Sequence, residues 1–247
     1  MDKTPIKRVL FFDVETTGIP DRKLPADDPA QPRICSFAAL LCEHSPDLLV
    51  RQAVHMLACP DGWTVPENVV AIHGLTTELL VEYGVPTKLI LEVAADLMLR
   101  ADQWTAHSVD FDLKMLRGEF RRAGMDDLFD KRPKFCTMRG TAAALGTGWP
   151  KLKDAYRHFV GKELTGAHGA AADVRACREI YRHLGFSRTA DMHRHGAITP
   201  AGSDKMPPEP AGPQPREGYG GTTAALQYHS TMVGTEAEDF LSGGPGA

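Results

Sequence analysis

Four acids and one histidine have the residue types and spacing that could do chemistry in this chain. They lie in three short segments, FFDVETTG, AHSVDFD and HGAAAD, as Asp13, Glu15, Asp112, His168 and Asp173. Carboxylate oxygens are the ligands that Mg²⁺ and Mn²⁺ prefer, and an imidazole titrating near neutrality can take a proton from water. If the three segments meet in space, they could hold two divalent cations and activate a water molecule.

The first segment places two carboxylates on one face of a predicted strand. Residues 7–14 are rich in strand-forming apolar residues, and side chains two positions apart leave a strand on the same side. Asp13 directly follows a Leu-Phe-Phe run, so we expect a buried carboxylate that needs a cation or several hydrogen-bond donors to stay ionised. An acid at a strand end could instead cap the turn that follows.

The other two segments each carry an acid at a predicted helix start. Asp110 and Asp112 both lie where a strand gives way to a helix, and either acid could bind a metal or cap the helix N-terminus. His168 stands five residues before Asp173, with only glycine and alanine between them. Small residues let a substrate come close, but such a histidine could also be structural or solvated. No segment alone decides between these interpretations.

In this order, the three segments resemble the DEDDh family of proofreading 3′→5′ exonucleases, which includes the epsilon subunit of bacterial DNA polymerase III. The resemblance covers about residues 7–185. Two further segments, AIHGLTTELL and FCTMRGTAAALG, are similar to the family's Ile-His-Gly element and to its strand and short Ala/Leu-rich helix. The resemblance implies an RNase H-like α/β fold, with helices on both faces of a mixed five-stranded sheet.

The resemblance also implies a role for each candidate residue. His168 would be the general base, and Asp110 would be a bystander. Ser108 stands where family members often have asparagine, which puts one contact behind the metal ligands in doubt. The ligands of two divalent cations, Mg²⁺ with Mn²⁺ as a substitute, would be four carboxylates: Asp13, Glu15, Asp112 and Asp173.

The implied activity is metal-dependent 3′→5′ hydrolysis of single-stranded or frayed DNA ends to nucleoside 5′-monophosphates, in proofreading or repair. Thr16 and Thr17 would present their backbone to the terminal nucleotide, and His73 would contact its sugar or base. One alternative is an RNA-trimming 3′→5′ exoribonuclease of the same family, because nothing in these motifs reads a 2′-hydroxyl. Another is a module with a nuclease fold that binds a replication complex.

The hydrophobic pattern predicts the elements that position these residues. Strands come first and then alternate with helices, which implies a mixed sheet flanked by helices. A short break at HSPD indicates a hairpin, and glycines are expected to end the later helices. The predicted strands are 7–14, 33–43, 48–60, 104–109 and 134–138, and the longer predicted helices are 86–101, 111–124, 151–161 and 169–185.

Length and composition favour one domain with an appendage. The chain has 247 residues, of which 43% are hydrophobic, enough for one good-sized core. We expect an exonuclease domain over residues 1–186 and a disordered Pro/Gly-rich tail over 187–247. Within that tail, residues 224–233 could order on a partner such as a DNA polymerase. No apolar run is long enough to span a bilayer and no leader is evident, so we expect a soluble, cytoplasmic protein.

The charge distribution bears on nucleic-acid binding. The net charge is −4, but residues 1–186 carry 24 Lys and Arg against 25 Asp and Glu. Two bound divalent cations would therefore make this region net positive. Basic clusters at Arg117, Arg121 and Arg122 and at residues 131–134 suggest a weak grip on a strand, although such clusters are often ordinary solvated faces. Five cysteines without a CxxC pair indicate buried, reduced thiols.

Overall fold

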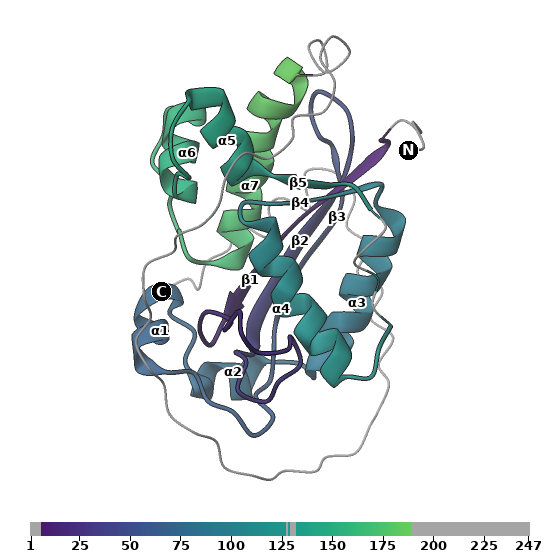
Figure 1. The fold of residues 1–247 in the computed structure, drawn as a ribbon, viewed down its shortest axis with the longest axis vertical. Helices are drawn as coiled ribbons and strands as arrows, with labels where there is room; N and C mark the ends of the chain where they lie inside the picture. Colours follow the sequence, from purple (N-terminus) through teal and green to yellow (C-terminus); the bar gives the residue numbers. More distant parts are fainter. Residues whose placement is uncertain (1–5, 127, 129–131, 189–247) are drawn as a thin grey trace.

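The computed structural model of the protein describes residues 6–126, 128 and 132–188, and a five-stranded mixed sheet lies at its centre (Figure 1). The sheet order is β3-β2-β1-β4-β5. β2 is antiparallel to both β1 and β3, whereas β4 runs parallel to β1 and β5 parallel to β4. The strands are β1 (Arg8–Thr16), β2 (Ile34–Glu43), β3 (Val50–Leu57), β4 (Gln103–Ala106) and β5 (Lys134–Cys136).

Helices cover both faces of the sheet, as the sequence predicted (Figure 1). α7 (Ala170–Arg188) packs on one face, and α3 (Thr87–Arg100) and α4 (Val109–Arg122) pack on the other. Two short helices continue the α7 layer, and two more lie beyond the tip of β1. These four are α5 (Thr137–Leu145), α6 (Leu152–Val160), α1 (Glu67–His73) and α2 (Thr77–Tyr83).

The central strand β1 is buried on both faces, which explains its continuous apolar run. Leu10 and Phe12 pack into the core under α3 and α4, whereas Val9 and Phe11 pack against α7. This alternation continues along the strand, because successive side chains point to opposite faces. It therefore directs the carboxylates that follow Phe12 by one and three positions toward the α7 side.

Several predicted boundaries differ from the structure by one to three residues, and two of these differences have a clear physical reason. α4 begins at Val109, two residues before the predicted start, because the strand before it already ends at Ala106. α7 continues through Gly185 to Arg188. A glycine inside a helix costs only about 1 kcal/mol and does not by itself end it.

The predicted tail lies outside the described residues from position 189 onward, as does the segment 224–233 that could order on a partner. α7, the longest helix of the described residues, has too polar a composition to cross a bilayer, and no other described helix has the length and hydropathy to do so.

A buried ion-pair network ties α4 to the beginning of β2. Glu119 on α4 is 1% exposed, and its carboxylate accepts from Arg33 Nε at 2.7 Å and Nη2 at 3.1 Å. The backbone N–H of Ile34 and the guanidinium of Arg122, both at 3.2 Å, also contact this carboxylate. Because the loop before Ile34 joins β1 to β2, the network fixes the segment that follows the first acidic motif.

We expect Glu119→Ala to destabilise the protein by about 3–5 kcal/mol, because it leaves two guanidinium groups without their buried counter-charge. Glu119→Gln should cost less, since it keeps one oxygen acceptor. The urea midpoint measures both changes, provided that the slope of the unfolding transition is unchanged. Glu92→Ala, which removes an exposed carboxylate from α3, is the control and should stay within about 0.5 kcal/mol. An equally mild effect of Glu119→Ala would contradict the assigned role of the network.

Candidate active site

Acids from two distant segments meet beside the end of β1. One carboxylate oxygen from each of Asp13, Glu15 and Asp173 lies within 4.8 Å of the other two. The two β1 acids face the α7 side of the sheet, and Asp173 lies in the first turn of α7. The pairing of β1 with β2 shifts register directly after Glu15, and such irregularities re-aim side chains at strand ends. The structure thus brings together three of the four predicted ligands.

Asp112, the fourth predicted ligand, lies next to this group in the first turn of α4. It is 2% exposed, and its Oδ1 accepts a hydrogen bond from the backbone N–H of Val14 at 3.3 Å. β4 pairs with β1 only along Val9–Phe11, so Val14 lies beyond the paired part of that edge. The Asp112 carboxylate therefore takes the place of a strand partner, between the two acids of β1. Asp110, by contrast, is exposed and forms an ion pair with Arg139.

The donor set suits hard divalent cations. All four side chains offer oxygen, which is the donor that Mg²⁺ and Mn²⁺ prefer. The Oδ1 atom of Asp173 is buried and has no hydrogen-bond partner among the described residues. A buried carboxylate oxygen without a donor is costly, and a cation would satisfy it.

Crowding of the carboxylates raises their pKa values. Burial, followed by repulsion from Asp173 and Asp112, raises the pKa of Glu15 to about 8. Burial is also the first cause for Asp13, whose pKa is raised well above its usual range with further contributions from the other three acids. The pKa of Asp173 rises to about 6, although a backbone N–H donor partly offsets the effect of burial. In the protein alone, the raised pKa thus favours the protonated form of Glu15 near neutrality, and cations would favour the ionised forms of the acids.

Burial raises the pKa of Asp112 as well, with repulsion from Asp173 adding to the effect and the Val14 N–H opposing it. Asp112 therefore interacts electrostatically with the same group of acids, although it is not among the three whose oxygens lie within 4.8 Å of one another. Its contribution as a ligand stays a prediction, as do those of the other three.

His168 lies at the start of α7, exposed to solvent, in a backbone conformation that residues other than glycine seldom adopt. Its φ is +66°, and its backbone N–H donates to Asp173 Oδ2 at 3.3 Å. The acid therefore helps to hold the histidine in this left-handed conformation, for which histidine is several-fold enriched. An exposed imidazole beside a buried acid group is open to water and to a substrate, which suits a proton acceptor.

The turn after β1 and His73 form the other side of the site. His73 Nδ1 accepts from the Leu75 backbone N–H, which assigns the ring proton to Nε2 and makes it the donor to the Thr16 carbonyl at 3.3 Å. The Thr17 backbone N–H donates to the Arg33 carbonyl. The Thr16 carbonyl and the Thr17 N–H therefore both form hydrogen bonds that stabilise the turn. Contact of Thr16, Thr17 and His73 with a nucleotide stays a prediction.

Burial lowers the pKa of His73, and the proximity of His168 lowers it further, against the opposing effect of the Thr16 hydrogen bond. The two histidines are thus near enough to sense each other's charge. They come from segments 95 positions apart and approach the acid group from different elements.

Sequence reasoning did not single out two histidines near the site. His55 on β3 lies in the same cross-strand row as Asp13, and its Nε2 is 3.1 Å from Ser36 Oγ. His107 is the second, with hydrogen bonds to Thr137 Oγ1 at 3.0 Å and to the Pro150 carbonyl at 3.1 Å. His107 thereby ties the end of β4 to α5 and to the loop before α6. Only its place directly after a buried strand could have indicated this from the sequence.

The fold is similar to that of solved Escherichia coli exonuclease I structures. A zinc-bound complex with single-stranded DNA is 21% identical with a TM-score of 0.59, over 74% of this chain and 42% of that one. A complex with a dT13 oligonucleotide is also 21% identical with a TM-score of 0.58, over 76% and 44%. A further exonuclease I structure, 20% identical, has a TM-score of 0.61 over the same shares. These likenesses confirm the predicted RNase H-like fold.

This chain spans less than half the length of the exonuclease I chains that it matches. Among curated proteins, none matches it. The family model RNase_T, described as exonuclease, matches residues 10–181, which include the strand with the first two acids and most of the helix with the last. The chain therefore belongs to the exonuclease family.

Proposed function

We propose that this exonuclease is a metal-dependent 3′→5′ exodeoxyribonuclease that removes nucleoside 5′-monophosphates from single-stranded or frayed DNA ends, in proofreading or repair. The observation that carries the proposal is the meeting of Asp13, Glu15 and Asp173, with Asp112 beside them and one buried oxygen without a donor. The exonuclease I structures, by their names, hold single-stranded DNA, which supports a strand of the same kind as substrate.

The four carboxylates would hold two divalent cations, for which Mg²⁺ is the first candidate and Mn²⁺ a substitute. Bound there, the cations would lower the pKa of a water molecule and neutralise charge on the scissile phosphate. His168 would accept the proton of the attacking water, because its side chain is exposed and its backbone N–H contacts Asp173 of the acid group. The four carboxylates would be less suited to accept this proton, since they would bind the two cations.

The terminal nucleotide would lie against the Thr16–Thr17 turn and His73, beside the hydrogen bond that joins them. The hydrogen bond from His73 Nε2 to the Thr16 carbonyl keeps the ring in one orientation before the substrate arrives. A preorganised site loses less entropy when the nucleotide binds.

A gel time course on 3′-labelled and 5′-labelled single strands tests polarity and metal dependence together. With Mg²⁺ or Mn²⁺, we expect a 3′ label to be released at once as a mononucleotide and a 5′-labelled strand to shorten stepwise. EDTA should stop both. Matched DNA and RNA strands should show a preference for DNA.

Other outcomes would correct the proposed polarity, substrate or metal dependence. Release of the 5′ label as a mononucleotide would show that the polarity is 5′→3′. Faster hydrolysis of RNA than of DNA would make the protein an exoribonuclease. Unchanged rates in EDTA would remove the cations from the mechanism.

A further inference from the structure

The loop between α5 and α6 presents a large aromatic side chain to solvent. Trp149 in this loop is 66% exposed, whereas Trp104 on β4 is 1% exposed. An exposed indole leaves apolar surface in water, and the burial of a large apolar side chain is worth about 1.5–3 kcal/mol. Single exposed aromatic residues are common on protein surfaces, so the place and the support of this one decide what it can bind.

Hydrogen bonds on both sides of Trp149 give the loop a defined shape. On one side, Thr147 Oγ1 donates to the Gly148 carbonyl at 3.1 Å. On the other side, the Pro150 carbonyl is 3.1 Å from His107 Nε2, and because a carbonyl can only accept, this nitrogen carries the proton. A side chain that is already held in place loses less entropy when it binds a ligand.

His107 anchors this loop at the end of the sheet where the acid group lies. β4 runs parallel to β1, and the last pair between them is Phe11 with Thr105. His107 follows that pair by two positions on β4, as Asp13 does on β1, so both residues lie at the same end of neighbouring strands. Adjacent strands are roughly 5 Å apart, so the residue that anchors the loop is close to the first acid.

Contacts on the α7 face link the same anchor to the acid group. His107 Nδ1 is 3.0 Å from Thr137 Oγ1, which in turn is 3.5 Å from Cys177 Sγ on α7. Cys177 lies about one helical turn after Asp173. Burial raises the pKa of Cys177, the Thr137 hydroxyl opposes this, and the charge of nearby Asp13 raises it further. A short series of contacts therefore joins the loop to the acid group.

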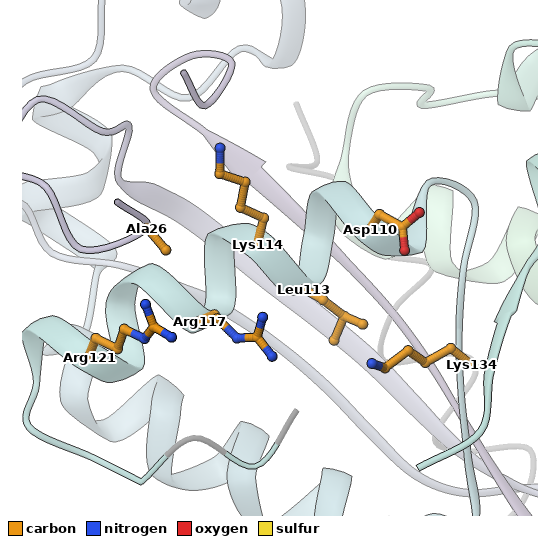
Figure 2. Close-up of a pocket in the computed structure, with 7 residues that line it drawn as sticks. All are labelled: Ala26, Asp110, Leu113, Lys114, Arg117, Arg121 and Lys134. Atoms are coloured by element: carbon orange, nitrogen blue, oxygen red, sulfur yellow. The ribbon is translucent and has the colours of Figure 1, made fainter. Parts of the chain in front are cut away.

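The basic pocket on α4 lies in a different direction from the acid group. It has a volume of about 380 Å³, and its lining includes Lys114 and Arg121 (Figure 2). Successive residues of a helix are about 100° apart, so these two side chains leave α4 on the face opposite to Asp112. The pocket therefore does not extend the acid site, whereas the loop of Trp149 is anchored beside it.

Charge next to Trp149 suits a nucleic-acid strand. Lys151 is exposed and follows Trp149 by two positions, at the start of α6. The acids that come next along the chain, Asp154 and Glu163, both pair with Arg157. A base could stack on the indole while a neighbouring phosphate lies near the lysine, and aromatic residues combined with cations are common in proteins that bind single strands.

We propose that Trp149 stacks on one of the last few bases of the substrate strand, on the 5′ side of the nucleotide that is removed. The inference rests on the proposed function, because the 3′ end of the strand must lie at the acid group. Every base has a π face, so this contact would not depend on sequence. Because the stack forms before cleavage and persists through it, its loss should raise KM and leave kcat nearly unchanged.

A scan with abasic strands tests the stack. Each ten-nucleotide oligothymidylate lacks one base, at successive positions from the 3′ end, and kcat/KM is measured for release of the first nucleotide with Mg²⁺. In the wild-type protein, one abasic position should lower kcat/KM by roughly 5–150-fold, the effect of one stacked base. Trp149→Ala should lose the same factor on the intact strand and no longer respond to that position.

Two further variants complete the scan. Trp149→Phe keeps an aromatic ring, so it should retain most of the wild-type kcat/KM and the response to the abasic position. Leu99→Ala is the matched control, because it removes a large exposed apolar side chain from α3, on the other face of the sheet. It should change neither value.

Intrinsic fluorescence gives a second readout that needs no cleavage. The chain has three tryptophans, of which Trp149 is exposed, Trp63 is half-buried and Trp104 is buried. Stacking of a base on Trp149 should quench the emission when a ten-nucleotide strand binds in EDTA. The quench should disappear in Trp149→Phe, while the anisotropy of a labelled strand should show that this variant still binds with near wild-type affinity.

The outcomes separate this inference from the proposed function. If binding quenches Trp149 in EDTA but no nucleotide is released with Mg²⁺ or Mn²⁺, the function is wrong and the stack stands. If the wild-type protein cleaves and Trp149→Ala keeps its kcat/KM, the stack is wrong. A loss in Trp149→Ala with an unchanged response to every abasic position would also overturn it, because Trp149 would then act on the fold or the site and not on a base. A dimer that becomes a monomer in Trp149→Ala, with strand binding unchanged, would overturn it in favour of a contact between protein chains.

Discussion

Asp13→Asn should abolish metal-dependent cleavage and at the same time raise the melting temperature of the metal-free protein. The first effect follows from the loss of a predicted charged ligand in the acid group, where bound cations would stabilise the transition state by several kcal/mol. At 1.36 kcal/mol for each factor of ten, turnover should fall roughly a thousandfold or more. Single-turnover hydrolysis of a short DNA strand with Mg²⁺ measures this loss.

The gain in stability has an electrostatic origin. Burial and repulsion from the neighbouring acids raise the pKa of Asp13 in the folded protein, so ionising it costs free energy that the unfolded chain does not lose. Asparagine keeps the shape and removes the charge. Relief of about 1 kcal/mol would raise the melting temperature by about 2–4 °C for a domain of this size.

The sign of the pH dependence follows from the raised pKa values. Between the ordinary carboxyl value near 4 and the value of about 8 for Glu15, the folded protein binds more protons than the unfolded chain. The stability of the metal-free protein should therefore fall as pH rises through this window, and less steeply in Asp13→Asn. At pH 3, below the ordinary carboxyl value as well, the two proteins should melt together, because Asp13 is then mostly neutral in the folded and in the unfolded chain.

Metal should reverse the order of the two melting temperatures. We expect Mn²⁺ to bind the folded wild-type protein and to raise its melting temperature above that of Asp13→Asn, which should bind the ion weakly. Asp61→Asn, a matched change at an exposed loop residue, should leave both activity and melting unchanged. A wild-type rate for Asp13→Asn with Mg²⁺ would remove this residue from the metal site, and a lower melting temperature in EDTA at pH 8 would show that its charge stabilises the fold.

The parts of the site that sequence reasoning could predict are local. The two-residue spacing of Asp13 and Glu15 on an apolar strand fixes their common face, and the structure confirms it. The mixed sheet and the hairpin of β2 and β3 follow from the hydrophobic pattern and one turn. These features depend on neighbours in the chain, whose geometry the residue types largely determine.

The parts that could not be predicted depend on contacts between distant segments. Asp112 lies against the Val14 N–H because β4 stops short along β1, and strand length and register set this distance. Glu119 reads as one more polar position of an amphipathic helix, yet it is buried against Arg33, 86 positions away.

The basic cluster of α4 shows the same limit. From spacing alone, Arg117, Arg121 and Arg122 form one group, and an ordinary solvated face is a fair interpretation. The structure divides them, because Arg122 turns to the buried Glu119 while the other two line a pocket with Lys134. Lys134 comes from β5, and only the pairing of β5 with β4 brings it there.

His168→Ala should lower turnover by roughly 10²–10⁴-fold, the usual contribution of a general base, and leave Mn²⁺ binding intact. The side chain is exposed, and the contact of this residue with a predicted ligand is made by its backbone N–H, which donates to Asp173 Oδ2. Turnover is measured with saturating DNA, and Mn²⁺ binding by calorimetry on the same preparation. His158→Ala, at an exposed position on α6, is the control and should keep the wild-type rate.

A backbone effect must be separated from a proton-transfer effect, because His168 has φ +66° and holds Asp173 through its N–H. Alanine is strained in that conformation and glycine is not, while neither can accept a proton. If the imidazole is the base, His168→Gly should lose as much turnover as His168→Ala, and added imidazole should restore part of it to the glycine variant. If the conformation is what matters, His168→Gly should keep most of the activity while His168→Ala loses both turnover and Mn²⁺ affinity through a displaced Asp173. The second pattern would leave water activation to the acid group and make His168 a positioning residue.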